Sequence, residues 1–298
     1  VVVAYLLGLR RTLHHVVRDL LSPEELHDAL AFLLIALVVL PLMPDRALGP
    51  YRAVNPASIT RLVVVLTALS GAGYAAQRWL GARFGMVVSG FAGGFVSSSA
   101  TIAACAMRAR EQPHTMRAAA AGALASCVAT VVEYIVLLGA TDLALLRSMA
   151  LPLGAALLAA LIGTGLYFAG SGKDDQATSA RGRAFRLPVV AGLGVVVGLV
   201  AILSAGLQAR FGTAGVVVVS LISGFVDAHA TSGSVAGLYH SGEVGLSVAE
   251  PAILCALSSN TLTKLVMASA GRSLRFTLLV GPFVLAIAGA AWLGFWWS

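Results

Sequence analysis

The sequence has few charged residues. Asp, Glu, Lys and Arg make up 11% of its 298 residues, whereas soluble domains carry about 25%. Hydrophobic residues make up 58%, and the mean hydropathy is +0.90. This composition excludes an ordinary soluble domain and predicts an integral membrane protein that is embedded over nearly all of its length.

Lysine and cysteine are also scarce. The chain has 2 Lys against 18 Arg, with a net charge of +7. Because the Arg residues cluster in short loops, anionic headgroups of the lipid bilayer explain them better than nucleic acid, which we do not expect as a partner. Cys105, Cys127 and Cys255 lie in apolar stretches without metal-ligand spacing and are predicted to be packing residues.

Several catalytic motifs are absent from the sequence. It has no His-Glu-x-x-His, no Gly-x-Ser-x-Gly and no Walker motif. An intramembrane aspartyl protease needs two carboxylates that share a proton, and Asp227 has no Asp partner at its depth. We therefore expect that the chain is not an enzyme and needs no cofactor.

One phrase occurs twice. Gly94 to Thr101 reads Gly-Phe-Val-Ser-Ser-Ser-Ala-Thr, and Gly224 to Thr231 reads Gly-Phe-Val-Asp-Ala-His-Ala-Thr. Arg-Phe-Gly stands a dozen or so residues before each copy. Repeated phrases at long spacing indicate a repeated structural unit. In the second copy Asp and His replace two serines, so the two units would differ in charge at matched positions.

Apolar segments predict an all-α fold, a polytopic transmembrane bundle of about ten helical segments. Residues 1–20 end an apolar helix and continue as a basic amphipathic helix, so we expect the chain to be the C-terminal part of something longer. A capping box at Ser22-Pro23-Glu24-Glu25 opens the next helix, which extends to Leu42. Eight more segments follow, each near the roughly 20 residues that cross a bilayer: 57–80, 84–108, 116–139, 145–169, 187–207, 211–239, 248–270 and 274–297.

The expected organisation has two homologous four-segment repeats. Residues 1–56 come first, 57–170 form the first repeat, 171–186 form a polar linker placed in the cytoplasm, and 187–298 form the second repeat. Four full crossings in each repeat would make them parallel, whereas a segment that dips in and returns would invert them. The sequence leaves both arrangements open, together with the oligomeric state, a homo-oligomer included.

The best candidate for a functional residue is Asp227, because a charge in the middle of a membrane segment costs about 3 kcal/mol by insertion scales. Thr231 and Ser234 share its helical face, and Ser97 and Thr101 occupy the matched positions in the first repeat. Small residues beside these polar groups predict broken or closely packed helices at 89–101 and 220–233. The predicted break and packing residues are Gly90, Gly93, Gly94 and Gly224.

Three other charged groups fall inside apolar segments. Lys264 lies one turn after Asn260, so that either Lys264 neutralises Asp227 or a transported cation displaces it. His229 is a proton relay or a satisfied histidine. Glu133, next to Tyr134, is predicted to form a polar pair near the membrane interface.

These residues resemble a known family. Asn55-Pro56, Gly73-Tyr74, Gly93 to Thr101, Asp227 to Thr231 and Asn260-Thr261-Leu262-Thr263-Lys264 are similar to the uncharacterised bacterial membrane domain found C-terminal to MgtC/SapB-type domains. The resemblance implies a multi-pass protein of the bacterial inner membrane whose N-terminal MgtC-type domain is missing from this chain. It supplies no reaction.

Two functions remain from the sequence. The first is a secondary transporter or channel for a small ion or polar solute, with a site at the midplane between the repeats. Its ligands would be a carboxylate and hydroxyls, which suit a proton or a hard cation such as Na⁺, K⁺ or Mg²⁺. The substrate-binding or ion-binding residues would be Asp227, Thr231, Ser97, Ser98, Thr101, Asn260, Lys264 and His229. The alternative is a non-transporting regulator that binds another membrane protein.

Overall fold

The computed structural model describes residues 22–46, 48–49, 54–169, 195, 198–204, 206–207 and 210–298. Within these ranges seven helices are long and apolar enough to cross a bilayer, which indicates a multi-pass membrane protein. The predicted helix at 1–20, the linker and most of segment 187–207 lie outside the described residues, so the count of ten stays a prediction. The main helices are α2 (Pro23–Leu34), α3 (Leu40–Leu42), α4 (Pro56–Glu111), α5 (Met116–Thr141), α6 (Leu143–Ser148), α7 (Ala150–Phe168), α9 (Thr213–His240), α10 (Leu246–Ala270) and α11 (Leu274–Trp296).

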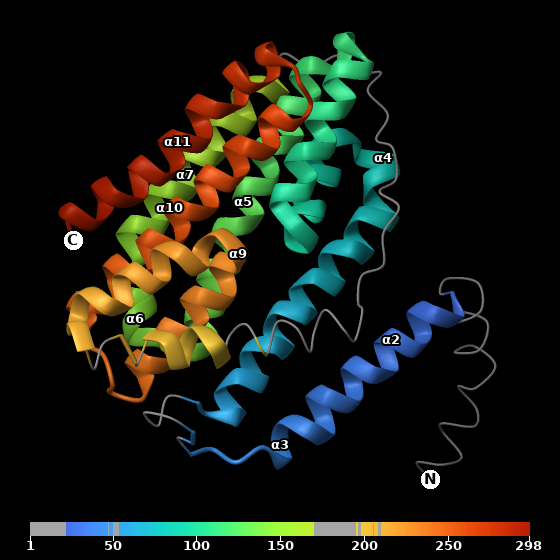
Figure 1. Cartoon of the computed structure of the whole chain (residues 1–298). Helices are drawn as coiled ribbons and strands as arrows, with labels where there is room; N and C mark the ends of the chain where they lie inside the picture. Colours follow the sequence, from blue (N-terminus) through green and yellow to red (C-terminus); the bar gives the residue numbers. More distant parts are fainter. Residues whose placement is uncertain are drawn as a thin grey trace.

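The predicted capping box opens α2. Ser22 Oγ accepts from the backbone N–H of Glu25 at 3.2 Å, and the Glu25 carboxylate accepts from the backbone N–H of Ser22 at 2.7 Å. The other Glu25 oxygen accepts from the Tyr74 hydroxyl at 2.6 Å. This last bond ties α2 to α4 at the edge of the molecule, where the two helices run side by side (Figure 1).

Two long helices are broken where the sequence predicts it. In α4 the backbone leaves the helical region at Ser97, with φ −169° and ψ 105°. In α9 it does so at Asp227, with φ −156° and ψ 106°. Both residues follow a Gly-Phe-Val tripeptide, so the same local sequence interrupts both helices. The prediction of broken Gly-rich segments is confirmed.

A second interruption precedes each break. Gly85 has φ 81° inside α4, and Gly212 has φ 64° directly before α9. Glycine adopts positive φ at little cost because it has no Cβ. Each Arg-Phe-Gly sequence therefore allows a sharp turn before its Gly-Phe-Val segment.

Helices α5 and α10 run antiparallel. Asp142, directly after α5, contacts His240 at the end of α9, and α10 begins six residues later. At the other end a Cβ built on Gly271, directly after α10, would lie 2.7 Å from backbone atoms of Ala106, in the last turns of α4 before α5. Thus α10 begins where α5 ends, and it ends where α5 begins.

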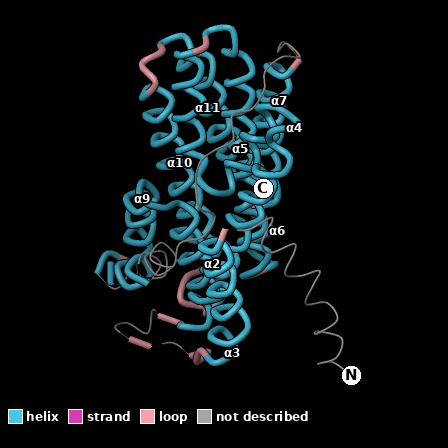
Figure 2. Tube along the Cα trace, turned by 90° about the vertical axis from the view of Figure 1, so that its right-hand side faces the viewer, coloured by secondary structure: helices cyan, strands magenta, loops and turns pink. Residues whose placement is uncertain are grey.

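Helices α7 and α11 form a second antiparallel pair. The Tyr167 hydroxyl, near the end of α7, donates to the Leu279 carbonyl near the start of α11 at 2.9 Å. Gly294, near the end of α11, packs against Pro152 near the start of α7. Figure 2 shows α5, α7, α10 and α11 together in one bundle, with α2 and α9 nearer its lower end. One apolar core joins this bundle to the second half of α4.

Candidate functional site

One face of α5 is polar, although the helix is buried over most of its length. Ser126, Thr130 and Glu133 recur at helical spacing on it, and Cys127 and Tyr134 lie beside them. All five side chains are buried. The helical spacing of Ser126, Thr130 and Glu133 is the sequence signal that indicates this face.

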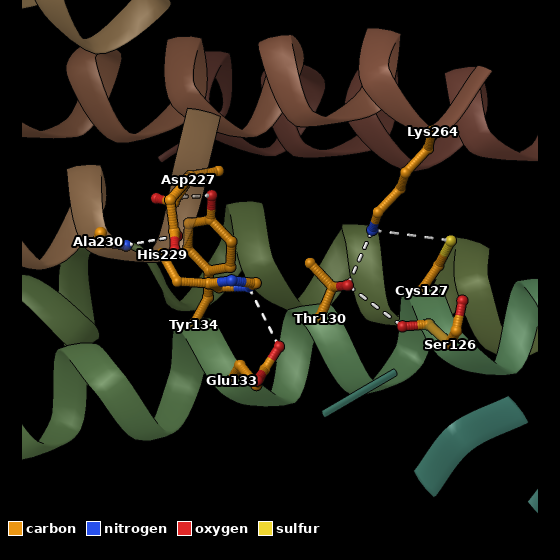
Figure 3. Close-up of polar contacts among 10 residues, drawn as sticks. Ser126, Cys127, Thr130, Glu133, Tyr134, Asp227, His229, Ala230 and Lys264 are labelled. Carbon is orange, nitrogen blue, oxygen red and sulfur yellow. Dashed lines mark hydrogen bonds and ion pairs between the residues drawn. The ribbon is translucent and has the colours of Figure 1, made fainter. Parts of the chain in front are cut away.

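Lys264 reaches this face from α10. Its Nζ donates to Thr130 Oγ1 at 2.8 Å and lies 3.9 Å from Cys127 Sγ (Figure 3). The lysine side chain is only 4% exposed. Among the described residues no ion pair joins Lys264 to Asp227, so the predicted pairing of these two charges is wrong. The nearest polar partner of the ammonium group is a neutral hydroxyl.

Glu133 meets His229 from α9. The distance from Glu133 Oε2 to His229 Nε2 is 3.2 Å, and Figure 3 shows the imidazole directed toward the carboxylate. The Tyr134 ring lies 5.1 Å from the imidazole between centroids, and its hydroxyl donates to the Ala228 carbonyl at 3.4 Å. Glu133 is 4% exposed and lies about 12 Å from the end of α5. The charged partner of Glu133 is therefore His229 and not Tyr134, whereas its depth in the membrane stays a prediction.

Asp227 occupies the break in α9. Its Oδ1 accepts from the backbone N–H of Ala230 at 2.9 Å, which caps the second half of the helix. At the break in α4, Ser97 Oγ accepts from the backbone N–H of Ala100 at 3.3 Å in the same way. Asp227 also lies in Coulombic range of both Glu133 and His229. Charged groups of α5, α9 and α10 thus gather beside the break, and we call Glu133, Asp227, His229 and Lys264 the charged cluster.

The neutral candidates differ in whether they contact this cluster. Thr231 is buried; its Oγ1 donates to the Asp227 carbonyl at 2.7 Å and lies 3.0 Å from Ser223 Oγ. Ser98 is buried, whereas Thr101 and Asn260 are partly buried. In the described part of the chain none of these last three hydrogen-bonds to the cluster. The structure therefore brings Thr231 to the cluster and leaves the other three without a direct contact to it.

Of the predicted packing glycines, Gly90, Gly94 and Gly224 lie at helix contacts. A Cβ on Gly94 would lie 2.8 Å from Ser126 Cα, and a Cβ on Gly224 would lie 2.7 Å from Ala256 Cα. Each broken helix therefore packs closely on the helix that follows it, α4 on α5 and α9 on α10. All four predicted glycines are buried: Gly90, Gly93, Gly94 and Gly224.

A preformed metal centre is not part of this arrangement. Within the described ranges no group of three or more His, Cys, Asp or Glu side chains is placed to hold a metal ion. The cluster contains two carboxylates, one imidazole and one ammonium group, which suit proton binding and charge compensation.

The fold and the cluster define a polytopic helical membrane protein with buried charges beside the break in α9. Residues 64–271 match the family described as Domain of unknown function (DUF4010), and the chain belongs to this family. No curated protein and no solved structure matches the chain. The association with MgtC/SapB-type domains stays a prediction.

Proposed function

We propose that the protein is a secondary transporter or channel for a small ion or polar solute, and that its site is the charged cluster. The observation that carries the proposal is the burial of Glu133 and Lys264, each 4% exposed, on different helices that meet beside a helix break. Each buried charge costs about 3 kcal/mol by insertion scales. Packing alone does not require such groups, whereas ion and substrate pathways do.

The charge of Asp227 supports a role beyond the helix cap. Capping needs only a polar acceptor, and Ser97 provides one in α4 without any charge. We therefore assign Asp227 as a cation or proton ligand. Thr231, Ser97, Ser98 and Thr101 are proposed as neutral oxygen ligands around it. Lys264 supplies the counter-charge, and Asn260 on the same helix is assigned to gating.

An apolar layer separates the cluster from a cleft at the end of α5 and α9. Leu62, Leu66, Leu137 and Ala230 form a small buried group, and Leu137 is one turn from Glu133 on α5. The cleft lies on the outer side of this layer. Its lining includes polar and apolar side chains: Arg61, Thr141, His240, Leu62 and Leu137. We propose that movement of this layer opens the cluster to water.

The antiparallel pairs support an inverted repeat. If 57–170 and 187–298 are related units, α5 corresponds to α10 and α7 to α11, and each pair runs in opposite directions. The breaks at Ser97 and Asp227 then occupy equivalent places. Many secondary transporters are built in this way, with their sites at the broken helices where the repeats meet. We assign no catalytic reaction to the chain, and we place it in the bacterial inner membrane.

Ion uptake into proteoliposomes tests this function. The purified chain is reconstituted and uptake of Na⁺, K⁺ and Mg²⁺ is followed under an imposed gradient. We expect uptake of at least one of them above that of empty vesicles, and loss of that uptake in Asp227→Asn. Because Asn caps helices as well as Asp does, this change removes the charge and keeps the break. Glu111→Gln, an exposed carboxylate at the end of α4, is the matched control.

Two outcomes contradict the proposal. Uptake by Asp227→Asn equal to that of the wild type would show that Asp227 is not a ligand. A folded wild-type chain that takes up none of the three ions and none of a panel of small polar solutes would favour the alternative, a regulator that binds another membrane protein.

A further inference from the structure

The charged cluster has an unequal number of acidic and basic groups. Lys264 contributes one positive charge, and Glu133 and Asp227 contribute two negative charges. The charged and titratable side chains that face one another here are those of Glu133 and Tyr134 on α5, Asp227 and His229 on α9, and Lys264 on α10. With His229 neutral and both carboxylates ionised, the fixed charges sum to minus one.

A net charge is costly in a low-dielectric interior. Two different ligands can cancel it. One is a proton on the pair formed by His229 and Glu133, because His229 Nε2 lies 3.2 Å from Glu133 Oε2 and neither buried atom has a hydrogen-bond partner among the described residues. The other is a cation at Asp227, which is only partly buried and uses Oδ1 for the helix cap. Among the described residues Asp227 Oδ2 has no protein partner, so this oxygen is open to an ion.

We propose that the cluster binds either one proton, held between His229 and Glu133, or one monovalent cation at Asp227, and that the two exclude each other. This inference rests on the proposed function and names the ligands of the same site. The proton comes from solution, adds to His229 Nε2 or Glu133 Oε2 and returns to solution when the cation binds. A divalent ion fits less well, because it would convert a net charge of minus one into plus one. Carboxylate, hydroxyl and carbonyl oxygens at the break are ligands that hard monovalent cations accept.

Competition of this kind links cation binding to proton release. Purified protein in detergent, held in weakly buffered solution, receives NaCl or KCl, and released protons are measured with a pH-indicator dye. We expect release of up to about one proton per chain, largest at one pH within a scan from about pH 4 to 9. Above its dissociation constant, each tenfold rise in Na⁺ or K⁺ should lower the midpoint of protonation by about one pH unit.

The controls separate specific binding from ionic strength. Choline chloride at the same concentration should release no protons, and MgCl₂ should release fewer than NaCl or KCl. Asp227→Asn should lose the proton release that the cation causes. His229→Gln should not bind the proton and should therefore release none, while Glu111→Gln should behave as wild type. Gel-filtration profiles show which variants remain folded.

The wild-type protein alone decides the inference. No proton release by Na⁺ or K⁺ at any pH in the scan overturns it, and release by choline equal to that by Na⁺ or K⁺ also overturns it. Because this assay needs no gradient, its outcome is separate from the uptake assay. Ion uptake without proton release would leave the transporter in place and remove only the competition.

Discussion

Replacing Gly224 with alanine tests the close contact between α9 and α10. A Cβ at this position would lie 2.7 Å from Ala256 Cα, 2.8 Å from the Ala256 carbonyl oxygen and 3.1 Å from Ser259 Cβ. The nearest two atoms belong to backbone and cannot rotate away. The helices must separate by about 0.7 Å to reach ordinary van der Waals contact, and a gap of that size forfeits a quarter to a half of each affected contact energy.

We expect Gly224→Ala to lower the free energy of unfolding by about 2 kcal/mol, the middle of the range for overpacked sites. This corresponds to a change of about 30-fold in the folding equilibrium. The hydrogen bond from Ser259 Oγ to the Leu221 carbonyl crosses the same helix contact and should weaken as well. Unfolding in mixed micelles with increasing SDS, followed by tryptophan fluorescence, measures the effect.

Gly237→Ala is the matched control in the same helix. A Cβ there has no neighbour within 4 Å, and alanine is favoured over glycine in helices by up to about 1 kcal/mol. This variant should therefore be as stable as the wild type or more stable. Equal stability of Gly224→Ala and Gly237→Ala would refute the contact geometry on which the expectation rests.

Three further predictions concern polar groups. Lys264→Met alone should lower the free energy of unfolding by about 3–5 kcal/mol because it leaves buried carboxylate charge uncompensated. The double variant with Glu133→Gln should regain most of the lost thermal stability. If it regains none, Lys264 and Glu133 do not compensate each other. The hydrogen bond between His240 and Asp142 holds the pKa of Asp142 below its ordinary value of 3.8. Its stabilising effect is therefore present above that value and is lost as the pH falls through the lowered pKa. The difference in Tm between wild type and Asp142→Asn should be constant above pH 3.8 and shrink below it, and a difference that persists in acid would contradict this assignment. Tyr167→Phe should cost about 1 kcal/mol, the worth of one hydrogen bond, in the same SDS unfolding assay, and an unchanged unfolding curve would show that the bond to the α11 carbonyl contributes nothing.

Local features of the fold were predictable from the sequence because their causes are local. The capping box at Ser22 depends on residues three positions apart, and the breaks at Ser97 and Asp227 follow from small residues and from side chains that cap the next turn. The membrane location follows from composition alone. Each of these features depends on a few neighbouring residues or on the whole composition, which a single sequence displays.

The partners within the charged cluster were not predictable in this way. Pairing Lys264 with Asp227 was the simplest arrangement of two isolated charges, yet the lysine bonds to Thr130, and Glu133 meets His229. These partners belong to different helices and are distant in sequence. Their meeting depends on the rotation and crossing of α5, α9 and α10, which are set by how closely the backbones approach at the helix contacts.

The sequence by itself therefore determined that this protein is a helical membrane protein, where two of its helices break, and which charged residues lie inside apolar segments. Only the tertiary structure decided which of those residues meet. The reason is physical: helix breaks arise from the conformational preferences of neighbouring residues, whereas the contacts of a buried side chain depend on the packing of helices that are far apart in the chain.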